Sequence, residues 1–212
     1  MKAKQLSKDP FNIIITGVGG QGNVMASRIL SNMLVNKGYF VTIGETFGAS
    51  QRGGSVISHI RVSSRSAWGP LVPKGRGDVV VTLEPIEAIR VLAHYGNPAV
   101  EVLANTRAVY PASVTAGEST YPTLEEIKEM LKKLAARVWL IDATDEAVKL
   151  GNSILSNIIM MGALSAVGHL PIDQDDFTAV ISRTLPLDKI ADNLQAFALG
   201  VGMMKEKRRQ ER

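Results

Sequence analysis

Short apolar runs and amphipathic stretches alternate over the first two thirds of the chain. Residues 11–16 form an apolar run of strand length, and a glycine-rich turn follows it. From 23 to 36 the apolar positions recur near helical spacing, Gly38 closes that helix, and a second strand is predicted at 39–43. This order of strand, turn, helix and strand predicts a βαβ unit with parallel strands and a right-handed crossover.

The later part of the chain keeps this alternation and then becomes helical only. Thr123 begins a capping-box pattern that marks a helix start, and Asn152, Asp173 and Asp188 stand where helix N-caps would. Further strands are predicted at 55–62, 78–83, 100–104 and 138–141, and a further helix at 84–94. We therefore expect an α/β fold: a Rossmann-like, mostly parallel open sheet flanked by helices, with a C-terminal all-helical segment.

Length and composition fit one folded domain. The 212 residues predict a single domain over 1–212, with an α/β core at 10–142 and C-terminal helices at 151–204 that pack on it. Hydrophobic residues make up 45% and charged residues 21%, which excludes a disordered or fibrous chain. The chain contains no cysteine. It can therefore build no disulfide, thiolate nucleophile or cysteine-ligated zinc or iron–sulfur site.

The positive charge lies at the two ends of the chain. The formal net charge is +4, and segments 1–9 and 205–212 carry +2 and +3, which leaves −1 for the body. A nucleic-acid-binding domain gathers its basic residues on one folded face, so we expect no nucleic-acid partner. The apolar stretch 154–170 is interrupted by polar residues and glycines, so we expect no membrane span.

A glycine motif follows the first predicted strand. Gly17 to Gly22 satisfies G-x-G-x-x-G and opens a helix, which is the context this motif needs. Glycines allow close backbone approach, and a helix N-terminus offers free N–H groups to a phosphate. A nicotinamide-binding site also requires an acidic residue near the end of the second strand, which binds the ribose hydroxyls. Glu45 lies near that place but matches it poorly. Two interpretations remain: a nucleotide-binding turn, or a tight turn that packs on a neighbour.

A second glycine-rich loop contains an arginine. Gln51-Arg52-Gly53-Gly54 leaves the second strand at its carboxyl end. The Arg52 guanidinium suits phosphate or carboxylate, and the alternative is a surface arginine on a flexible loop. In open α/β sheets ligands bind at the carboxyl edge of the strands, so we expect both glycine motifs on one rim.

No nucleophile–base or metal-binding arrangement appears in the sequence. The three histidines are predicted in different elements, and no metal-ligand spacing occurs. Glu84 and Glu87 lie near a helix start, where carboxylates stabilise the helix dipole. Asp142, at a strand end, is a ligand candidate by position alone. We therefore predict no catalytic residue and no metal ligand in this chain.

Four segments resemble, in order along the chain, the motifs of the gamma-type subunits of 2-oxoacid:ferredoxin oxidoreductases. Three of them are similar to that family's G-x-G-G-Q-G opening, its Q-R-G-G-S loop, and its G-N-x-x-x-x-N…G-A-L helix. One further segment, Leu-Glu-Pro-Ile-Glu-Ala-Ile-Arg, looks most like the beta subunit of the indolepyruvate branch. In this chain the segments are 17–22, 47–56, 83–90 and 151–164. Matches in order over most of the chain are far more specific than any one of them.

The resemblance implies a division of labour between subunits. Such complexes decarboxylate a 2-oxoacid on thiamine diphosphate, transfer the acyl group to coenzyme A and pass electrons through iron–sulfur clusters to ferredoxin. The partner alpha subunit is expected to carry thiamine diphosphate and the clusters, which agrees with the missing cysteines. This chain would then hold no cofactor alone, with coenzyme A as the candidate ligand at the glycine rim. The expected complex is cytoplasmic, and the isolated chain is expected to be inactive and is a candidate homodimer.

The resemblance carries over a set of ligand-binding positions and leaves alternatives. The predicted cofactor-binding residues are Gly17, Gly19, Gly20, Gln21, Gly22, Gln51, Arg52, Gly53 and Gly54. A first alternative is the gamma subunit of a pyruvate, 2-oxoisovalerate or 2-oxoglutarate ferredoxin oxidoreductase. A second is a free-standing nucleotide-binding enzyme, such as a nicotinamide-dependent dehydrogenase. A third is a pure assembly module whose glycine turn is packed and never liganded.

Overall fold

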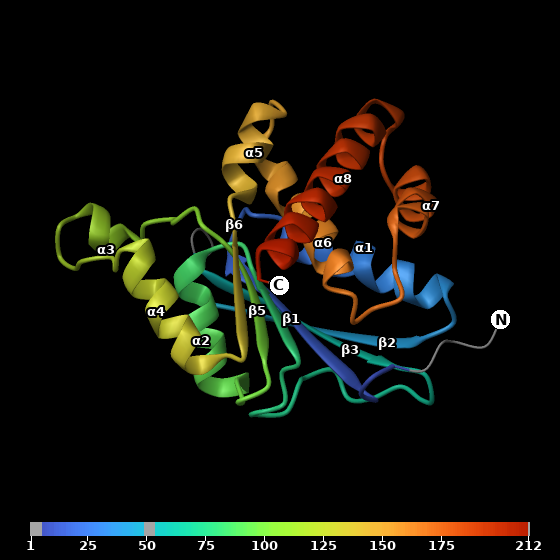
Figure 1. The fold of residues 1–212 in the computed structure, drawn as a ribbon, viewed down its shortest axis with the longest axis horizontal. Coiled ribbons are helices and arrows are strands. Elements are labelled where there is room, and N and C mark those ends of the chain that lie inside the picture. The colour runs from blue at the N-terminus through green and yellow to red at the C-terminus, as the bar shows by residue number, and fades with distance from the viewer. Residues whose placement is uncertain (1–5, 49–53, 212) are drawn as a thin grey trace.

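A six-stranded sheet forms the centre of the molecule, seen in a computed structural model that describes residues 6–48 and 54–211 (Figure 1). The strand order is β2-β3-β1-β4-β5-β6. The β1/β4, β4/β5 and β5/β6 pairs are parallel, whereas β3 runs antiparallel to both of its neighbours. The strands are β1 (Phe11–Val18), β2 (Phe40–Phe47), β3 (Ser55–Ser63), β4 (Val79–Thr82), β5 (Glu101–Asn105) and β6 (Arg137–Ile141).

Helices cover both faces of the sheet. The first face carries α1 (Asn23–Asn36), α6 (Ser156–Val167), α7 (Gln174–Thr184) and α8 (Leu187–Gln210); the second carries α2 (Pro85–Tyr95) and α4 (Leu124–Leu134). Alternate residues of β1 enter the two cores: Ile13 and Ile15 face the first layer and Ile14 the second. Within the described ranges, no helix combines the length and apolar character needed to cross a bilayer.

Three shorter helices complete the chain. They are α3 (Ala112–Thr115), α5 (Ala143–Lys149) and the 3-10 helix η1 (Ser153–Leu155). Neither α3 nor α5 was predicted from the sequence, because each is too short to show a helical period. The mostly parallel sheet, the helical flanks and the helical C-terminal segment are as the sequence predicts.

Two local predictions need correction. The expected βαβ unit has its two strands parallel, but β3 lies between β1 and β2, so these strands are not neighbours. Asp188 is not a helix cap, because α8 begins at Leu187 after Pro186 and Asp188 lies in its first turn. The other caps are confirmed: Asn152 Oδ1 accepts the Ile154 N–H at 3.1 Å, and Asp173 and Thr123 each form a capping box.

The helices α6 and α8 cross at two glycines. A Cβ at Gly162 would lie 2.9 Å from the carbonyl carbon of Phe197, and a Cβ at Gly200 would lie 3.0 Å from the Ala163 nitrogen. Phe197 also stacks on Phe177 of α7, with ring centroids 4.4 Å apart. The backbones of α6 and α8 therefore lie in close contact, which the missing side chains of the two glycines permit.

His59 is a polar residue inside the second core. Its side chain on β3 is fully buried, and neither ring nitrogen has a hydrogen-bond partner among the described residues. The ring meets Tyr95 edge-on, with centroids 5.0 Å apart. Burial lowers the pKa of His59 below its ordinary 6.5, because a charged imidazolium loses its hydration there.

We expect the His59→Phe variant to lose part of the acid sensitivity of the fold. Below pH 6.5 the unfolded state binds the His59 proton more readily than the folded state, so the folded state loses stability as the pH falls. The effect of the substitution on the free energy of unfolding should therefore be more favourable at pH 5.5 than at pH 7.5, by up to about 1.4 kcal/mol. Urea unfolding at both pH values measures this, with the exposed His94→Gln as control. An equal effect of His59→Phe at both pH values would contradict the prediction.

Candidate functional site

The turn between β1 and α1 needs glycine at two positions. Gly20 and Gly22 have φ of 98° and 81°, in the left-handed region that L side chains rarely adopt. Gln21 braces the turn from inside: the Val18 N–H donates to its Oε1 at 2.8 Å, and its Nε2 donates to the Leu83 carbonyl oxygen at 2.9 Å. Gln21 thus ties the glycine turn to the end of β4, and its amide contacts the protein rather than open space.

The C-terminal helical layer also contacts this turn. Asn157 of α6 is buried, and its Nδ2 donates to the Gly22 carbonyl oxygen at 3.3 Å. A Cβ at Gly22 would overlap that amide, and it would lie 3.5 Å from the Ile154 side chain. Asn157 is not among the predicted site residues, although it belongs to the segment 151–164 that resembles the family's Gly-Asn…Asn helix. The packing of this helix onto the turn could not be read from that spacing.

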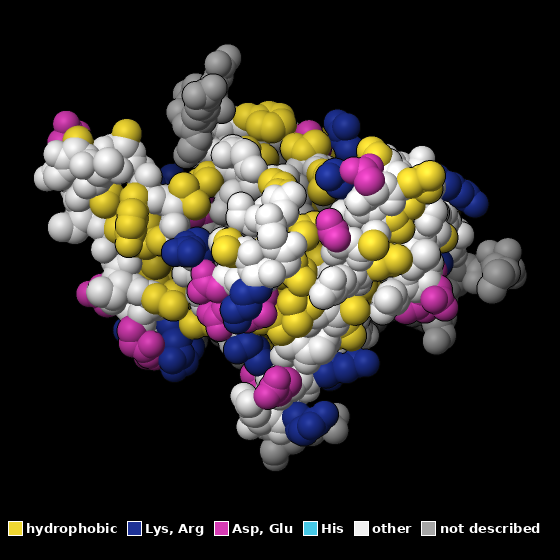
Figure 2. All heavy atoms as spheres, turned by 90° about the horizontal axis from the view of Figure 1, so that it is seen from above, with side chains coloured by type: hydrophobic (Ala, Val, Ile, Leu, Met, Phe, Trp, Pro, Cys, Tyr) yellow, Lys and Arg dark blue, Asp and Glu magenta, His cyan; other side chains and the backbone are white. Residues whose placement is uncertain are grey.

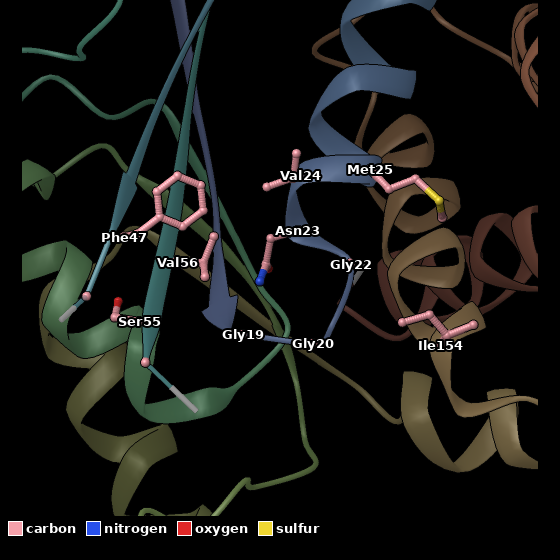
Figure 3. A pocket seen from close by; sticks show the side chains of 12 residues that line it. Gly19, Gly20, Gly22, Asn23, Val24, Met25, Phe47, Ser55, Val56 and Ile154 are labelled. Carbon is pink, nitrogen blue, oxygen red and sulfur yellow. The ribbon is translucent and has the colours of Figure 1, made fainter. Parts of the chain in front are cut away.

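The two glycine motifs meet at one cavity, as expected. The Gly19 N–H donates to the Gly54 carbonyl oxygen at 2.9 Å, which joins the first motif to the described end of the second. Gln51, Arg52 and Gly53 lie outside the described residues. The cavity has a volume of about 660 Å³ (Figure 3). Its lining comprises Gly19, Gly20, Gly22, Asn23, Val24, Met25, Phe47, Gly48, Gly54, Ser55, Val56 and Ile154.

The cavity combines a positive helix end with an apolar wall. The first turn of α1 borders it, has no side-chain cap and contains no acidic residue, so its backbone N–H groups and dipole favour an anion. Phe47 and Val56 lie on one side in Figure 3, with Met25 and Ile154 on the other. None of the described lining residues carries a titratable side chain. The arrangement suits binding of a molecule with anionic and apolar parts.

The topology places this cavity where open α/β sheets bind ligands. After β1 the chain crosses to the first face through α1, and after β4 it crosses to the second face through α2. The carboxyl ends of the neighbouring strands β1 and β4 therefore form a switch point. Glu45 of β2 is absent from the lining, and β3 separates β2 from β1 by two strand spacings, about 10 Å. Among the described residues, Glu45 is thus not placed to pair with a nicotinamide ribose in this cavity.

Two glutamates of α2 are more than helix stabilisers. Glu84 is fully buried and caps α2, with Oε2 accepting the Glu87 N–H at 3.1 Å. Its Oε1 accepts the Tyr121 hydroxyl and, at 3.3 Å, the Val109 N–H. Burial raises the pKa of Glu84, and these hydrogen bonds oppose that rise. Glu87 Oε2 accepts the Ser55 hydroxyl of β3 at 2.6 Å. Both carboxylates therefore join separate segments of the chain, which the dipole interpretation did not include.

Asp142, the ligand candidate by position, lies elsewhere, and so does the histidine His169. Asp142 Oδ1 accepts the Thr106 hydroxyl at 2.7 Å and borders a second cavity of about 490 Å³, beside the exposed Arg107–Asp145 ion pair. His169 Nε2 lies 2.7 Å from Oε2 of Glu101, the first residue of β5, which is at the end of that strand away from Thr106. Neither residue lines the glycine cavity.

Comparison with known proteins identifies relatives over nearly the whole chain. Residues 12–203 match the pyruvate ferredoxin/flavodoxin oxidoreductase family model. The Indolepyruvate oxidoreductase subunit IorB of Thermococcus kodakarensis is 38% identical over 197 residues, which cover 92% of this chain and 96% of that protein. The corresponding subunit of Archaeoglobus fulgidus is 39% identical over 191 residues, covering 90% and 93%.

One solved structure with the same fold is a much longer chain. The 2-oxoglutarate:ferredoxin oxidoreductase from Magnetococcus marinus, solved with 2-oxoglutarate, coenzyme A and succinyl-CoA bound, superposes with a TM-score of 0.72 at 20% identity. The match covers 94% of this chain and 32% of that one, so the likeness to it is one of fold. Given the family match over residues 12–203, this chain belongs to the pyruvate ferredoxin/flavodoxin oxidoreductase family.

Proposed function

We propose that this chain is the small subunit of an indolepyruvate:ferredoxin oxidoreductase and that its glycine cavity binds coenzyme A. The substrate assignment rests on relatives that share 38–39% identity over nearly their full length. The cavity itself carries the ligand assignment, because it joins an uncapped helix N-terminus to an apolar wall. Coenzyme A has both parts: anionic phosphates, and a pantetheine arm whose methyl and methylene groups can lie against an apolar wall.

The cavity residues fit such a ligand. The glycine turn at Gly19, Gly20 and Gly22, with the first N–H groups of α1, would hold a phosphate. Phe47, Met25 and Ile154 would contact the methyl and methylene groups of the pantetheine arm. We add Gln51, Arg52, Gly53 and Gly54 to this site from the sequence, with Arg52 as the phosphate-pairing side chain. Coenzyme A, when bound, supplies the thiol that accepts the acyl group.

The rest of the reaction is assigned to a partner. The described lining residues have no titratable side chain and the chain has no cysteine, so we assign to this subunit the binding and positioning of its ligand. We assign thiamine diphosphate and the iron–sulfur clusters to an alpha subunit that reduces ferredoxin, in a cytoplasmic complex.

Several large apolar side chains of this chain are exposed: Phe47 is 64%, Tyr110 62% and Leu187 87% exposed. Figure 2 shows hydrophobic patches among charged groups. Such exposure supports an assembled state.

We expect Arg52→Ala, in the complex reconstituted with its alpha subunit, to raise the KM for coenzyme A by about ten- to a hundredfold. A charge-assisted hydrogen bond to a phosphate contributes about 1.5–3 kcal/mol, which corresponds to that range. Initial rates at varied coenzyme A measure the effect, and the exposed Arg28→Ala on α1 serves as control. An unchanged KM would favour the pure assembly module, which the packing of Asn157 on Gly22 also allows.

Two further measurements test the identity of the enzyme. The isolated chain should show no turnover, and the complex should prefer indolepyruvate over pyruvate, 2-oxoisovalerate and 2-oxoglutarate in kcat/KM. Activity of this chain alone, or hydride transfer with saturable NAD(P)H binding, would overturn the subunit assignment. Preference for another 2-oxoacid would replace the substrate and leave the subunit role intact.

A further inference from the structure

Ser55 is the point at which β3 enters the wall of the glycine cavity. It is the first residue of β3 and pairs with Val18, the last residue of β1, and its carbonyl oxygen accepts the Gly48 N–H at 2.7 Å. The preceding residue, Gly54, accepts the Gly19 N–H at 2.9 Å. In Figure 3, Ser55 lies on the side of the cavity opposite Ile154. The place of Ser55 therefore sets how far this wall stands from the glycine turn.

One buried carboxylate of α2 holds the Ser55 side chain. The Ser55 hydroxyl donates to Glu87 Oε2 at 2.6 Å, and Glu87 is 2% exposed. Hydrogen bonds to a carboxylate are shorter and about twice as strong as neutral ones. The other carboxylate oxygen, Oε1, lies 3.3 Å from an Arg90 guanidinium nitrogen. Glu87 thus uses both oxygens while remaining outside the cavity lining.

The helix that carries Glu87 is itself fixed from the far side. The Glu87 N–H donates to Glu84 Oε2, and Glu84 Oε1 accepts from Tyr121 and Val109. The first turn of α2 is therefore held between the chain after β5 and the start of β3. Because the Glu87 carboxylate is buried and its helix is held in place, its hydrogen bond to Ser55 has a fixed geometry that an exposed carboxylate would not keep.

We propose that Glu87 is a positioning residue for the ligand cavity, acting through Ser55. The inference rests on the proposed function, since it names a residue that sets affinity for coenzyme A at the same site. Without the Glu87 carboxylate the Ser55 hydroxyl loses its buried acceptor, and the Gly54–Ser55 wall is free to shift from Gly19. Ligand affinity falls as a result, while the chemistry in the partner is untouched.

The test uses Ser55→Ala, Glu87→Ala, Glu87→Gln and the double alanine variant in the reconstituted complex. Ser55→Ala removes one oxygen at a strand end, so it keeps the fold even if Glu87→Ala does not. We expect Ser55→Ala and Glu87→Ala each to raise the KM for coenzyme A about tenfold, with kcat within about twofold of the parent. Glu87→Gln should restore the KM, because its amide oxygen accepts the same hydroxyl. The double variant should match Glu87→Ala alone.

A glutamate elsewhere gives the control, and the outcomes separate the two proposals. Glu129→Ala on α4 removes an exposed carboxylate paired with Lys132 and should leave the KM unchanged. An unchanged KM in Ser55→Ala, or a fall in kcat without a rise in KM, overturns the role of Glu87. If Arg52→Ala raises the KM in the same assay, the proposed function stands while this inference fails. If Ser55→Ala raises the KM and Arg52→Ala does not, Glu87 keeps its role and Arg52 loses its own.

Discussion

Replacing Gly200 by alanine should lower the free energy of unfolding by about 3 kcal/mol or more. In a helix interior this substitution ordinarily stabilises a protein by about 0.5–1 kcal/mol, so the expected sign is reversed. The reason is the contact between α6 and α8. A Cβ at Gly200 would meet the backbone of Ile159 and lie 3.0 Å from the Ala163 nitrogen. Backbone atoms cannot rotate away as a side chain can, so the two helices must separate.

Gly202 of the same helix provides a matched control. It is exposed, and a Cβ there would meet nothing within 4 Å. Gly202→Ala should therefore leave stability unchanged or raise it by up to about 1 kcal/mol. Urea unfolding followed by far-ultraviolet circular dichroism measures both variants under one condition. Equal unfolding midpoints for the two variants would show that α6 and α8 are not in backbone contact.

Gly22→Ala should destabilise the chain by about 2–4 kcal/mol and weaken coenzyme A binding in the complex. Two costs add: alanine in the left-handed region, and displacement of the Asn157 amide that donates to the Gly22 carbonyl oxygen. Urea unfolding of the isolated chain gives the stability, and the KM for coenzyme A reports the state of the turn.

Gly20 separates the two costs. Its φ of 98° carries the backbone penalty, but a Cβ there would meet nothing within 4 Å, so Gly20→Ala should cost only about 1–2 kcal/mol. In an Asn157→Ala background the excess cost of Gly22→Ala over Gly20→Ala should disappear. Its persistence in that background would mean that Asn157 does not press on the turn.

The sequence predicted the elements of this fold better than their arrangement. The apolar runs at β1 and β4 and the capping box at Thr123 are local signals, and each marks its element correctly. The placement of β3 between β1 and β2 depends on two ladders of strand pairing. One joins β3 to β1 and includes Phe11↔Val62, and the other joins β3 to β2 and includes Phe47↔Val56. A residue pattern reports which face of a strand is buried, and it does not report which strand lies beside it.

The candidate site, like the fold, could be predicted from the sequence only in part. The meeting of the two glycine motifs could be predicted, because the carboxyl ends of parallel strands share one edge of a sheet. The roles of Gln21, Glu87 and Asn157 could not, since each acts on a segment distant in sequence. Glu87 is an example. Its position near a helix start already explains a carboxylate there, because it stabilises the helix dipole. Only its burial and its hydrogen bond to Ser55 in the structure reveal a second role.

The contact between Asn157 and Gly22 spans 135 residues, and it has a consequence for the order of folding. The glycine turn leaves the ribosome early, but Ile154 and Asn157 emerge only after three quarters of the chain has been made. Contacts so distant in sequence form late, after the entropy of closing a long loop has been overcome. A nascent chain can therefore pair its first strands well before its ligand cavity exists, and the cavity is completed when the C-terminal helices dock.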